Sequence, residues 1–238
     1  MEPESAKRSQ NRATPNKQQV TGGIEITFYT DPLCCYTWVM QPHWKKFLEE
    51  FRETVNVTYK MVGLLPSWNN FSDSVNSIRK PMHMAPEWLH ATEISGVYID
   101  NSIWISDPPA SSFPACIAVK CVELQSTETA ALYFSMVQEA VMTKGLNIAR
   151  TAILLQLADQ LSQLDLSFNV YTFRQHLLGE NGKEAFRKDW QEAKYRDITR
   201  FPTLVFHAAG QNPVLLSGFQ SYESLSAFTH QLIPIFGP

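Results

Sequence analysis

Cysteine is the residue type through which this 238-residue chain could do chemistry, and the chain has four of them. Cys34 and Cys35 are adjacent in the segment DPLCCYTW, where a strand pattern ends and a helical pattern begins, and Cys116 and Cys121 stand further along. The N-terminus of a helix presents unpaired N–H groups and the positive end of the helix dipole, which favour a thiolate. We therefore expect Cys34 to be a reactive nucleophile.

The roles of Thr37 and of the cysteine next to Cys34 are open between alternatives. Thr37 shares a helical face with Cys34, so its hydroxyl either donates to the Cys34 sulfur or caps the first turn. Cys35 points away at about 100° around the helix and is either a packed small residue or a participant in the chemistry. Adjacent Cα atoms are ~3.8 Å apart, below the usual ~4.4 Å of a relaxed disulfide, so Cys34 and Cys35 are not expected to form one. Cys116 and Cys121 are expected to pack in the core.

A second candidate signal is the dipeptide Phe201-Pro202 in the segment ITRFPTLVF, directly before a strand pattern. A cis bond at this place would be typical of a constrained loop, but only ~5 to 6% of X-Pro bonds are cis. Taken alone, the segment therefore predicts an ordinary trans proline at the start of a strand.

The residues around Cys34 predict a βαβ unit. Residues 24–31 alternate apolar and polar side chains as a strand does, and residues 34–51 repeat apolar side chains at helical spacing, with Pro42 as a kink. Alternation at residues 55–61 predicts a second strand. Because a strand, helix and strand joined by short loops form a right-handed unit, the two strands are expected to be parallel.

The rest of the chain predicts a helical region and a closing hairpin. Residues 67–110 show no sustained period and indicate irregular loops and short helical turns. The expected helices are at residues 114–125, 130–143, 148–161 with Asn147 as cap, 168–178 and 183–195. A two-strand hairpin at 203–206 and 214–217 and a helix at 222–236 follow.

This order predicts three parts. Residues 1–23 hold almost no large apolar side chains and are expected to be a disordered tail. Residues 24–66 and 198–238 are expected to form one small domain, cut in two by an inserted helical domain at residues 67–197.

Composition excludes several classes of protein. With 44% hydrophobic and 18% charged residues the chain is globular, and a net charge of −3 gives no field that would attract nucleic acid or an anionic membrane. The histidines are scattered and no C-x-x-C is present, so neither a metal site nor a bound cofactor is expected. No stretch approaches the ~18 apolar residues of a membrane helix, and the polar start lacks a secretory signal. We expect a cytoplasmic protein, in which cysteines are more often catalytic than structural.

The order of strand, cysteine at a helix start, kinking proline, parallel strand, helical insertion and X-Pro before a hairpin resembles the thioredoxin superfamily, in its DsbA-like branch. The sequence around Cys34 is more similar still to that of the cytoplasmic FrnE-type members and the YjbH/SpxH adaptors, whose site segment reads D-P-[LIV]-C-x-W-C-W. Tyr36 conservatively replaces a tryptophan of that segment, and Thr37 replaces its second cysteine. The residues that match are Asp31, Pro32, Leu33, Cys34 and Trp38.

The resemblance implies an α/β fold of the thioredoxin type (βαβ…ββα) with a large inserted α-helical domain. It implies that Pro202 is the cis-proline beside the nucleophile and that the backbone of Phe201 pairs with a bound substrate chain, near Tyr36 and Trp38. Because Thr37 cannot resolve a mixed disulfide, Cys34 would act as a single cysteine and pass its intermediate to an external thiol such as glutathione.

Three functions remain open. The favoured one is a DsbA-family thiol-disulfide oxidoreductase or isomerase that acts on protein or peptide thiols and disulfides, with glutathione as co-substrate. The second is a non-redox adaptor of the YjbH/SpxH type, and the third a glutathione transferase or isomerase of the kappa class. An aromatic run supports a binding surface in the second case, or else forms the core of the insertion: Trp68, Phe71, Trp88, Tyr98 and Trp104.

Overall fold

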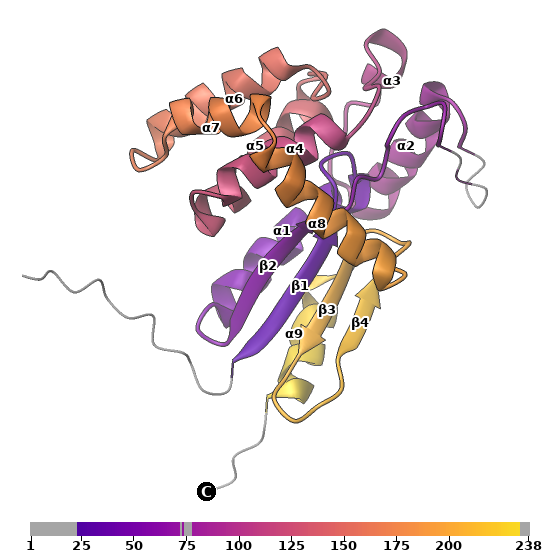
Figure 1. Ribbon diagram of the computed structural model, residues 1–238. Helices are drawn as coiled ribbons and strands as arrows, with labels where there is room; N and C mark the ends of the chain where they lie inside the picture. The colour runs from indigo at the N-terminus through magenta and orange to yellow at the C-terminus, as the bar shows by residue number, and fades with distance from the viewer. Residues whose placement is uncertain (1–22, 72, 74–77, 234–238) are drawn as a thin grey trace, which may run out of the picture.

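The computed structural model describes residues 23–71, 73 and 78–233 (Figure 1). The predicted tail, apart from Gly23, lies outside these residues. The strands are β1 (Ile24–Thr30), β2 (Val55–Met61), β3 (Thr203–His207) and β4 (Val214–Ser217). The helices are α1 (Cys35–Phe51), the short 3-10 helix η1 (Pro81–His83), α2 (Met84–Ser95), α3 (Ile103–Ser106), α4 (Phe113–Glu123), α5 (Thr127–Thr143), α6 (Thr151–Leu164), α7 (Val170–Leu178), α8 (Asn181–Tyr195) and α9 (Tyr222–Leu232).

The strands form one mixed sheet in the order β2-β1-β3-β4. β1 and β2 are parallel, so the predicted βαβ unit is confirmed, and Pro42 lies inside the connecting helix α1 as expected. β3 runs antiparallel to both β1 and β4, which confirms the closing hairpin. The sheet therefore brings the segment after β1, which holds Cys34, and the segment before β3, which holds Pro202, to the same end of two neighbouring strands.

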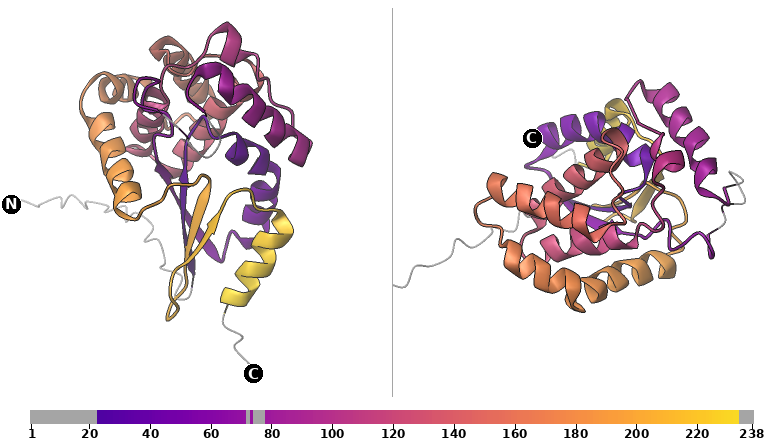
Figure 2. Two further views of the ribbon diagram at one scale, coloured as in Figure 1. Left: turned by 90° about the vertical axis from the view of Figure 1, so that its right-hand side faces the viewer. Right: turned by 90° about the horizontal axis from the view of Figure 1, so that it is seen from above.

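Helices cover both faces of the sheet (Figures 1 and 2). Alternate residues of β1, such as Ile26 and Phe28, pack into one buried cluster with Trp44 of α1 and Leu225 of α9. Tyr29 of the same strand belongs to a smaller cluster on the opposite face, where α8 packs. The period-two alternation of the strand thus places α1 and α9 on one face and α8 on the other.

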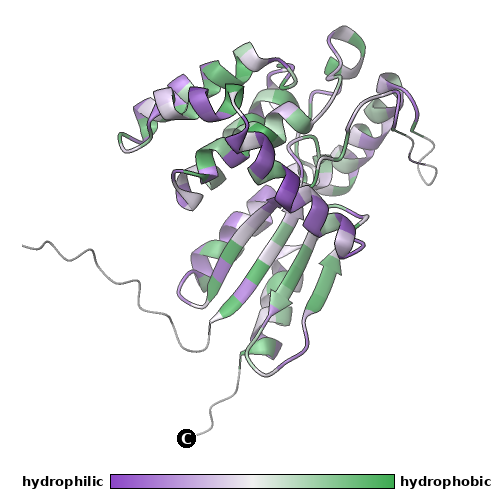
Figure 3. Ribbon diagram, in the orientation of Figure 1, coloured by the Kyte–Doolittle hydropathy of each residue, from purple (hydrophilic) through white to green (hydrophobic). Residues whose placement is uncertain are grey.

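Helix α8 is mostly hydrophilic, in contrast with the strands beside it (Figure 3). Its Asp189 is nevertheless buried, and its carboxylate accepts hydrogen bonds from the ammonium group of Lys60 at 3.0 Å and from the backbone N–H of Met61 at 3.1 Å. Lys120 of α4 lies 2.7 Å from the same carboxylate. This charged cluster fastens α8 to β2 and to α4.

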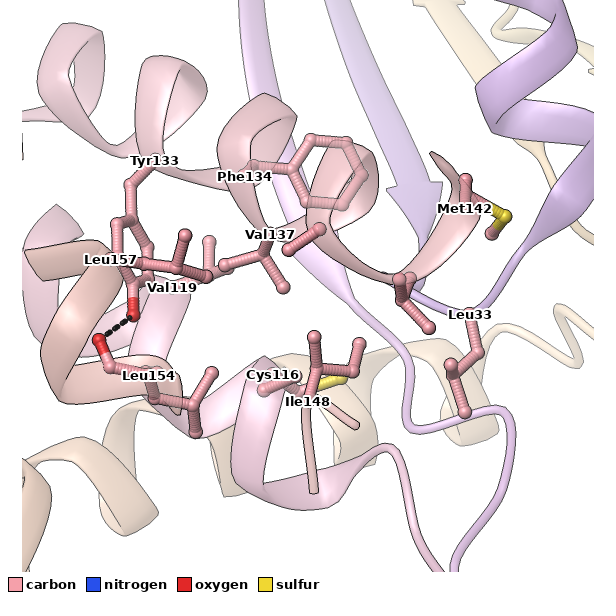
Figure 4. Packing of buried hydrophobic residues seen from close by; sticks show 14 of the residues in the cluster. Leu33, Cys116, Val119, Tyr133, Phe134, Val137, Met142, Ile148, Leu154 and Leu157 are labelled. Atoms are coloured by element: carbon pink, nitrogen blue, oxygen red, sulfur yellow. Dashed lines mark hydrogen bonds between the residues drawn. The ribbon is translucent and has the colours of Figure 1, made fainter. Parts of the chain in front are cut away.

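The helices α4 to α7 gather beyond one end of the sheet around the largest buried cluster (Figures 1 and 4). Tyr133 of α5 donates a 2.8 Å hydrogen bond to the carbonyl of Leu154 in α6 there. The cluster contains Cys116 and Cys121, which confirms the prediction that both pack in the core. It also contains Leu33, Cys35, Val39 and Met61 of the βαβ unit, so the sheet end and the helices share one interior.

The structure corrects several of the predicted helix positions, including the starts of α5, α7 and α8, which lie two or three residues from the predicted ones. Residues 84–95, expected to be irregular, form α2, which buries Met84, Trp88 and Ala91 at helical spacing. Helix α6 begins at Thr151 and not at 148, because the Asn147 side chain accepts a hydrogen bond from the N–H of Ala149 in a turn before it.

Helix α9 ends at Leu232 and not at 236, and residues 234–236 lie outside the described part of the chain. In the aromatic run, Trp88 and Trp104 are buried in the core, whereas Tyr98 is 65% exposed. The run is therefore neither wholly core nor wholly surface.

Candidate functional site

Cys34 is the N-cap residue of α1, with extended backbone angles of φ −76° and ψ 103°. The preceding Asp-Pro-Leu forms a tight turn, in which the N–H of Cys34 donates to the carbonyl of Asp31 at 2.9 Å. The carbonyl of Cys34 in turn accepts from Trp38 at 3.2 Å as α1 begins. The local sequence thus sets the sulfur at the start of the helix, although only 4% of the residue is exposed.

Burial decides the protonation state of Cys34. It raises the pKa of the thiol to about 11, and the nearby Asp31 carboxylate also raises it. Hydrogen bonds from the Thr37 hydroxyl and from the backbone N–H groups of Thr37 and Tyr36 lower the pKa, but by less. The Thr37 hydroxyl thus favours the thiolate of Cys34, as does the start of the helix, but the desolvation of the sulfur has the larger effect on its pKa.

The neighbours of Cys34 on α1 face different ways. The buried Thr37 hydroxyl shares a 2.7 Å hydrogen bond with the hydroxyl of Thr30 on β1. The Tyr36 hydroxyl donates to Glu87 of α2 at 2.6 Å. Trp38 donates its indole N–H to the carbonyl of Tyr98 at 3.1 Å. Burial raises the pKa of the Cys35 thiol well above its usual value as well.

Asp31 is the residue whose role the sequence did not indicate. It matched the family segment, but its wholly buried carboxylate also accepts hydrogen bonds from the N–H groups of Leu33 at 2.8 Å and Leu64 at 2.6 Å. The Ser112 hydroxyl donates at 2.7 Å and the Cys116 thiol at 3.3 Å. Burial raises the pKa of Asp31. The only feature of the sequence that could have indicated this buried role is the position of Asp31, before a proline at the end of a buried strand.

The peptide bond between Phe201 and Pro202 is cis, the isomer that the family resemblance implied and the dipeptide alone did not. The carbonyl of Pro202 accepts a 2.7 Å hydrogen bond from the N–H of Gly218, which ties this loop to the turn after β4. The loop thereby stands across from the start of α1.

A cleft of about 690 Å³ opens between these segments. Of the predicted site residues, Cys34, Cys35, Tyr36 and Phe201 line it, whereas Thr37, Trp38 and Pro202 do not. The remaining lining combines large apolar side chains with three charged residues and the hydroxyl residues Thr199 and Ser217. The other side chains in the lining include Leu64, Phe71, Ile78, Met84, Phe219, Asp73, Glu87 and Arg200.

A family model described as thioredoxin matches residues 28–227 of this chain. The chain belongs to this thioredoxin family. This match confirms the thioredoxin-type fold that the site segment predicted.

A curated relative is "ClpXP adapter protein SpxH" of Halalkalibacterium halodurans, 29% identical over 194 residues. The match covers 82% of this chain but 62% of the relative, so this chain spans less than two thirds of that protein's length.

Solved structures show the same fold. A putative protein disulfide isomerase from Nitrosomonas europaea has a TM-score of 0.73 at 19% identity, over 90% of this chain and 100% of the other. Cytosolic disulfide reductase DsbM from Pseudomonas aeruginosa has a TM-score of 0.67 at 18% identity, over 87% and 98%. A second structure of DsbM contains GSH.

Within residues 23–71, 73 and 78–233, no three metal-ligating side chains come together. None of the described helices has the length and apolar character needed to cross a membrane.

Proposed function

We propose that this chain is a protein-binding adaptor, and that the cleft beside Cys34 and Phe201 receives part of a partner protein. The observation that carries the proposal is the state of Cys34: a buried, neutral thiol without a second cysteine at the position of Thr37, in a cleft that is nevertheless open. The cleft thus offers a place for a polypeptide to bind, whereas the thiol chemistry that exchanges disulfides is reduced.

The chemistry of Cys34 supports this choice. A thiol with a pKa near 11 is ionised in roughly one molecule in 10⁴ at pH 7, and the thiolate is the species that attacks a disulfide. The Thr37 hydroxyl has no sulfur with which to release a mixed disulfide. Both the attack and the release steps are therefore slow without help.

The class of partner follows from the relatives. Because proteins similar to this chain over most of its length are named ClpXP adapters, we propose that it presents a bound protein to a ClpXP-type protease in the cytoplasm. The cleft suits an extended segment with large apolar side chains, since Phe71, Met84 and Phe219 line it.

The test is protein turnover. ClpXP and a soluble extract from the same organism are incubated with and without the chain, and protein half-lives are measured by mass spectrometry. We expect a defined set of proteins to disappear faster with the chain present. Phe201→Asp should remove the acceleration, and so should Arg200→Glu, which is exposed in the same cleft. Tyr195→Asp, exposed on α8 outside the cleft, is the matched control.

Cys34→Ser decides between adaptor and enzyme in that assay, because it removes the sulfur and leaves the cleft. An adaptor keeps its effect on turnover. Half-lives that do not change with the chain, or an acceleration that Cys34→Ser abolishes, would overturn the adaptor proposal.

A second candidate is a single-cysteine thiol-disulfide oxidoreductase with glutathione as co-substrate. What favours it is the convergence on the Cys34 sulfur of the Thr37 hydroxyl and two backbone N–H groups, all of which stabilise a thiolate. In this reaction Cys34 attacks a disulfide, displaces one thiol and forms a mixed disulfide with the other half. Glutathione then displaces Cys34, and its sulfur takes the place of Cys34 in the product disulfide. A mixed disulfide of Cys34 in native protein, with a protein thiol or with glutathione when the attacked disulfide contains glutathione, seen by mass spectrometry, tests it.

A further inference from the structure

A second cavity lies on the sheet side of α1 and is separate from the Cys34 cleft. It measures about 220 Å³, and its lining comes from α1, from α5 and from one residue each of β1 and β2. No residue lines both cavities. Thr37 lines this cavity, and its hydroxyl also lowers the pKa of Cys34. The proposed adaptor function makes no use of it.

Aromatic rings form much of the lining. The ring of Phe28 packs edge-on against Trp44 with centroids 5.0 Å apart and stacks on Tyr59 at 5.4 Å. The ring of Phe134 lies 5.7 Å from that of Tyr59. Rings already arranged edge-on and stacked offer a further flat ring favourable contacts at little cost in conformational entropy. The apolar part of a ligand here is therefore best met by an aromatic ring.

Two hydroxyl groups of the cavity are free to donate, besides the amide of Gln41, which donates to Gln138. The indole N–H of Trp44 donates to the Tyr59 hydroxyl oxygen at 2.8 Å, and the proton of that hydroxyl has no acceptor among the described residues. Burial raises the pKa of Tyr59 to about 12, which keeps the proton in place. The Ser135 hydroxyl likewise has no protein partner within the described chain. Free donors of this kind select a ligand that brings acceptor atoms.

The charge of the lining has one sign. Lys45 lines the cavity, no aspartate or glutamate does, and Lys45 makes no ion pair with any residue that the structure describes. Glu49, one turn along α1, is an exposed residue that does not line the cavity and makes no ion pair with Lys45. We propose that this cavity binds a small aromatic carboxylate, with its ring among Phe28, Trp44 and Phe134 and its carboxylate at Lys45 and the Tyr59 hydroxyl.

The probe that tests the site is 3-phenylpropionate, added to the full chain while the indole N–H resonances are followed by NMR. We expect the Trp44 resonance, assigned with Trp44→Phe, to shift and saturate, while the Trp38 resonance stays in place because its indole donates to Tyr98 elsewhere. Lys45→Met should weaken binding about tenfold through loss of the charge-assisted contact. Tyr59→Phe should weaken it less.

Two controls make the result decisive. Lys46→Met removes a neighbouring charge that lies over the Tyr222 ring and does not line the cavity, so it should leave binding unchanged. The neutral 3-phenylpropionamide should bind wild type and Lys45→Met equally weakly. An unshifted Trp44 resonance at millimolar probe, or equal binding of 3-phenylpropionate to wild type and Lys45→Met, would overturn the proposal and leave the adaptor function untouched.

Discussion

Cys34 receives two opposing influences, one from its place at the start of α1 and one from its burial. Because burial prevails and the pKa is about 11, the thiolate fraction should increase tenfold with each pH unit between 7 and 10. We therefore predict that the rate of Cys34 alkylation rises through this range and levels only near pH 11. Iodoacetamide labelling followed by peptide mass spectrometry measures it. A midpoint at or below ~8.5, the value of a free cysteine, would contradict the structure.

Thr37 marks the residue whose change should restore dithiol chemistry. Its side chain lies close to the Cys34 sulfur. Thr37→Cys would therefore create a Cys-x-x-Cys motif, in which the two cysteines can form a disulfide across one helical turn. We predict that this variant forms an internal disulfide on mild oxidation, seen as a mass loss of two hydrogens. It should also reduce insulin at least tenfold faster than wild type, because its second thiol can displace the substrate from the mixed disulfide. Thr37→Ser, which keeps the hydroxyl, is the control. A variant that stays reduced would show that the sulfurs cannot meet.

The parts of the site that depend on residues close in sequence could be predicted, and the parts that depend on residues distant in sequence could not. The place of Cys34 at the start of α1 and the hydrogen bond from Thr37 are local and were predictable from spacing. The depth of the sulfur was not, because the cleft walls also come from α2 and from the loop at Phe201, which are distant in sequence. The isomer of the bond at Pro202 likewise depended on the family resemblance, since the dipeptide itself favours trans.

Among the elements, α8 is attached by a buried charged cluster in addition to the apolar contacts of Phe186 and Trp190 with Phe113. Asp189→Ala would remove the carboxylate that lies 2.7 Å from the ammonium group of Lys120 and 3.0 Å from that of Lys60, and would leave them only their second partners, Glu123 and Glu192. Breaking a buried ion pair in this way typically costs about 3 to 5 kcal/mol. We predict a loss of that size in the free energy of unfolding, measured in urea, with faster amide exchange in α8.

The control for Asp189 is Asp159→Ala, which breaks an exposed pair with Arg174. An exposed pair contributes about 1 kcal/mol or less, so this variant should unfold almost like wild type. Equal losses in both variants would mean that burial adds nothing at Asp189.

Elements with a clear period were predictable and those without one were not. The strands and α1 follow the alternation and the helical repeat of their own residues. Helix α2 was missed because Trp88 and Ala91 are interspersed with exposed residues such as Leu89 and Ile94, which blur the period. The start of α6 was placed too early because Asn147 forms a side-chain turn of its own, which competes with the cap geometry.

At the scale of the whole molecule, the sequence predicted that residues 67–197 form an inserted domain. The largest buried cluster contains Leu33, Val39 and Met61 of the βαβ unit together with residues of α4 to α7. If the helices were removed, these side chains would be exposed to water, at roughly 1.5 to 3 kcal/mol for each large apolar one. The two parts therefore depend on each other for their stability.

We predict from this shared interior that the chain unfolds as one cooperative unit. Amide exchange followed by mass spectrometry at increasing urea should give the most protected amides of β3 and of α5 the same opening free energy and the same urea dependence, because neither part stays folded without the other. Cys121, buried in α4, should become alkylated at the same urea midpoint. Separate midpoints for β3 and α5 would show two independently folding parts, in which the contacts of Leu33, Val39 and Met61 add little to either.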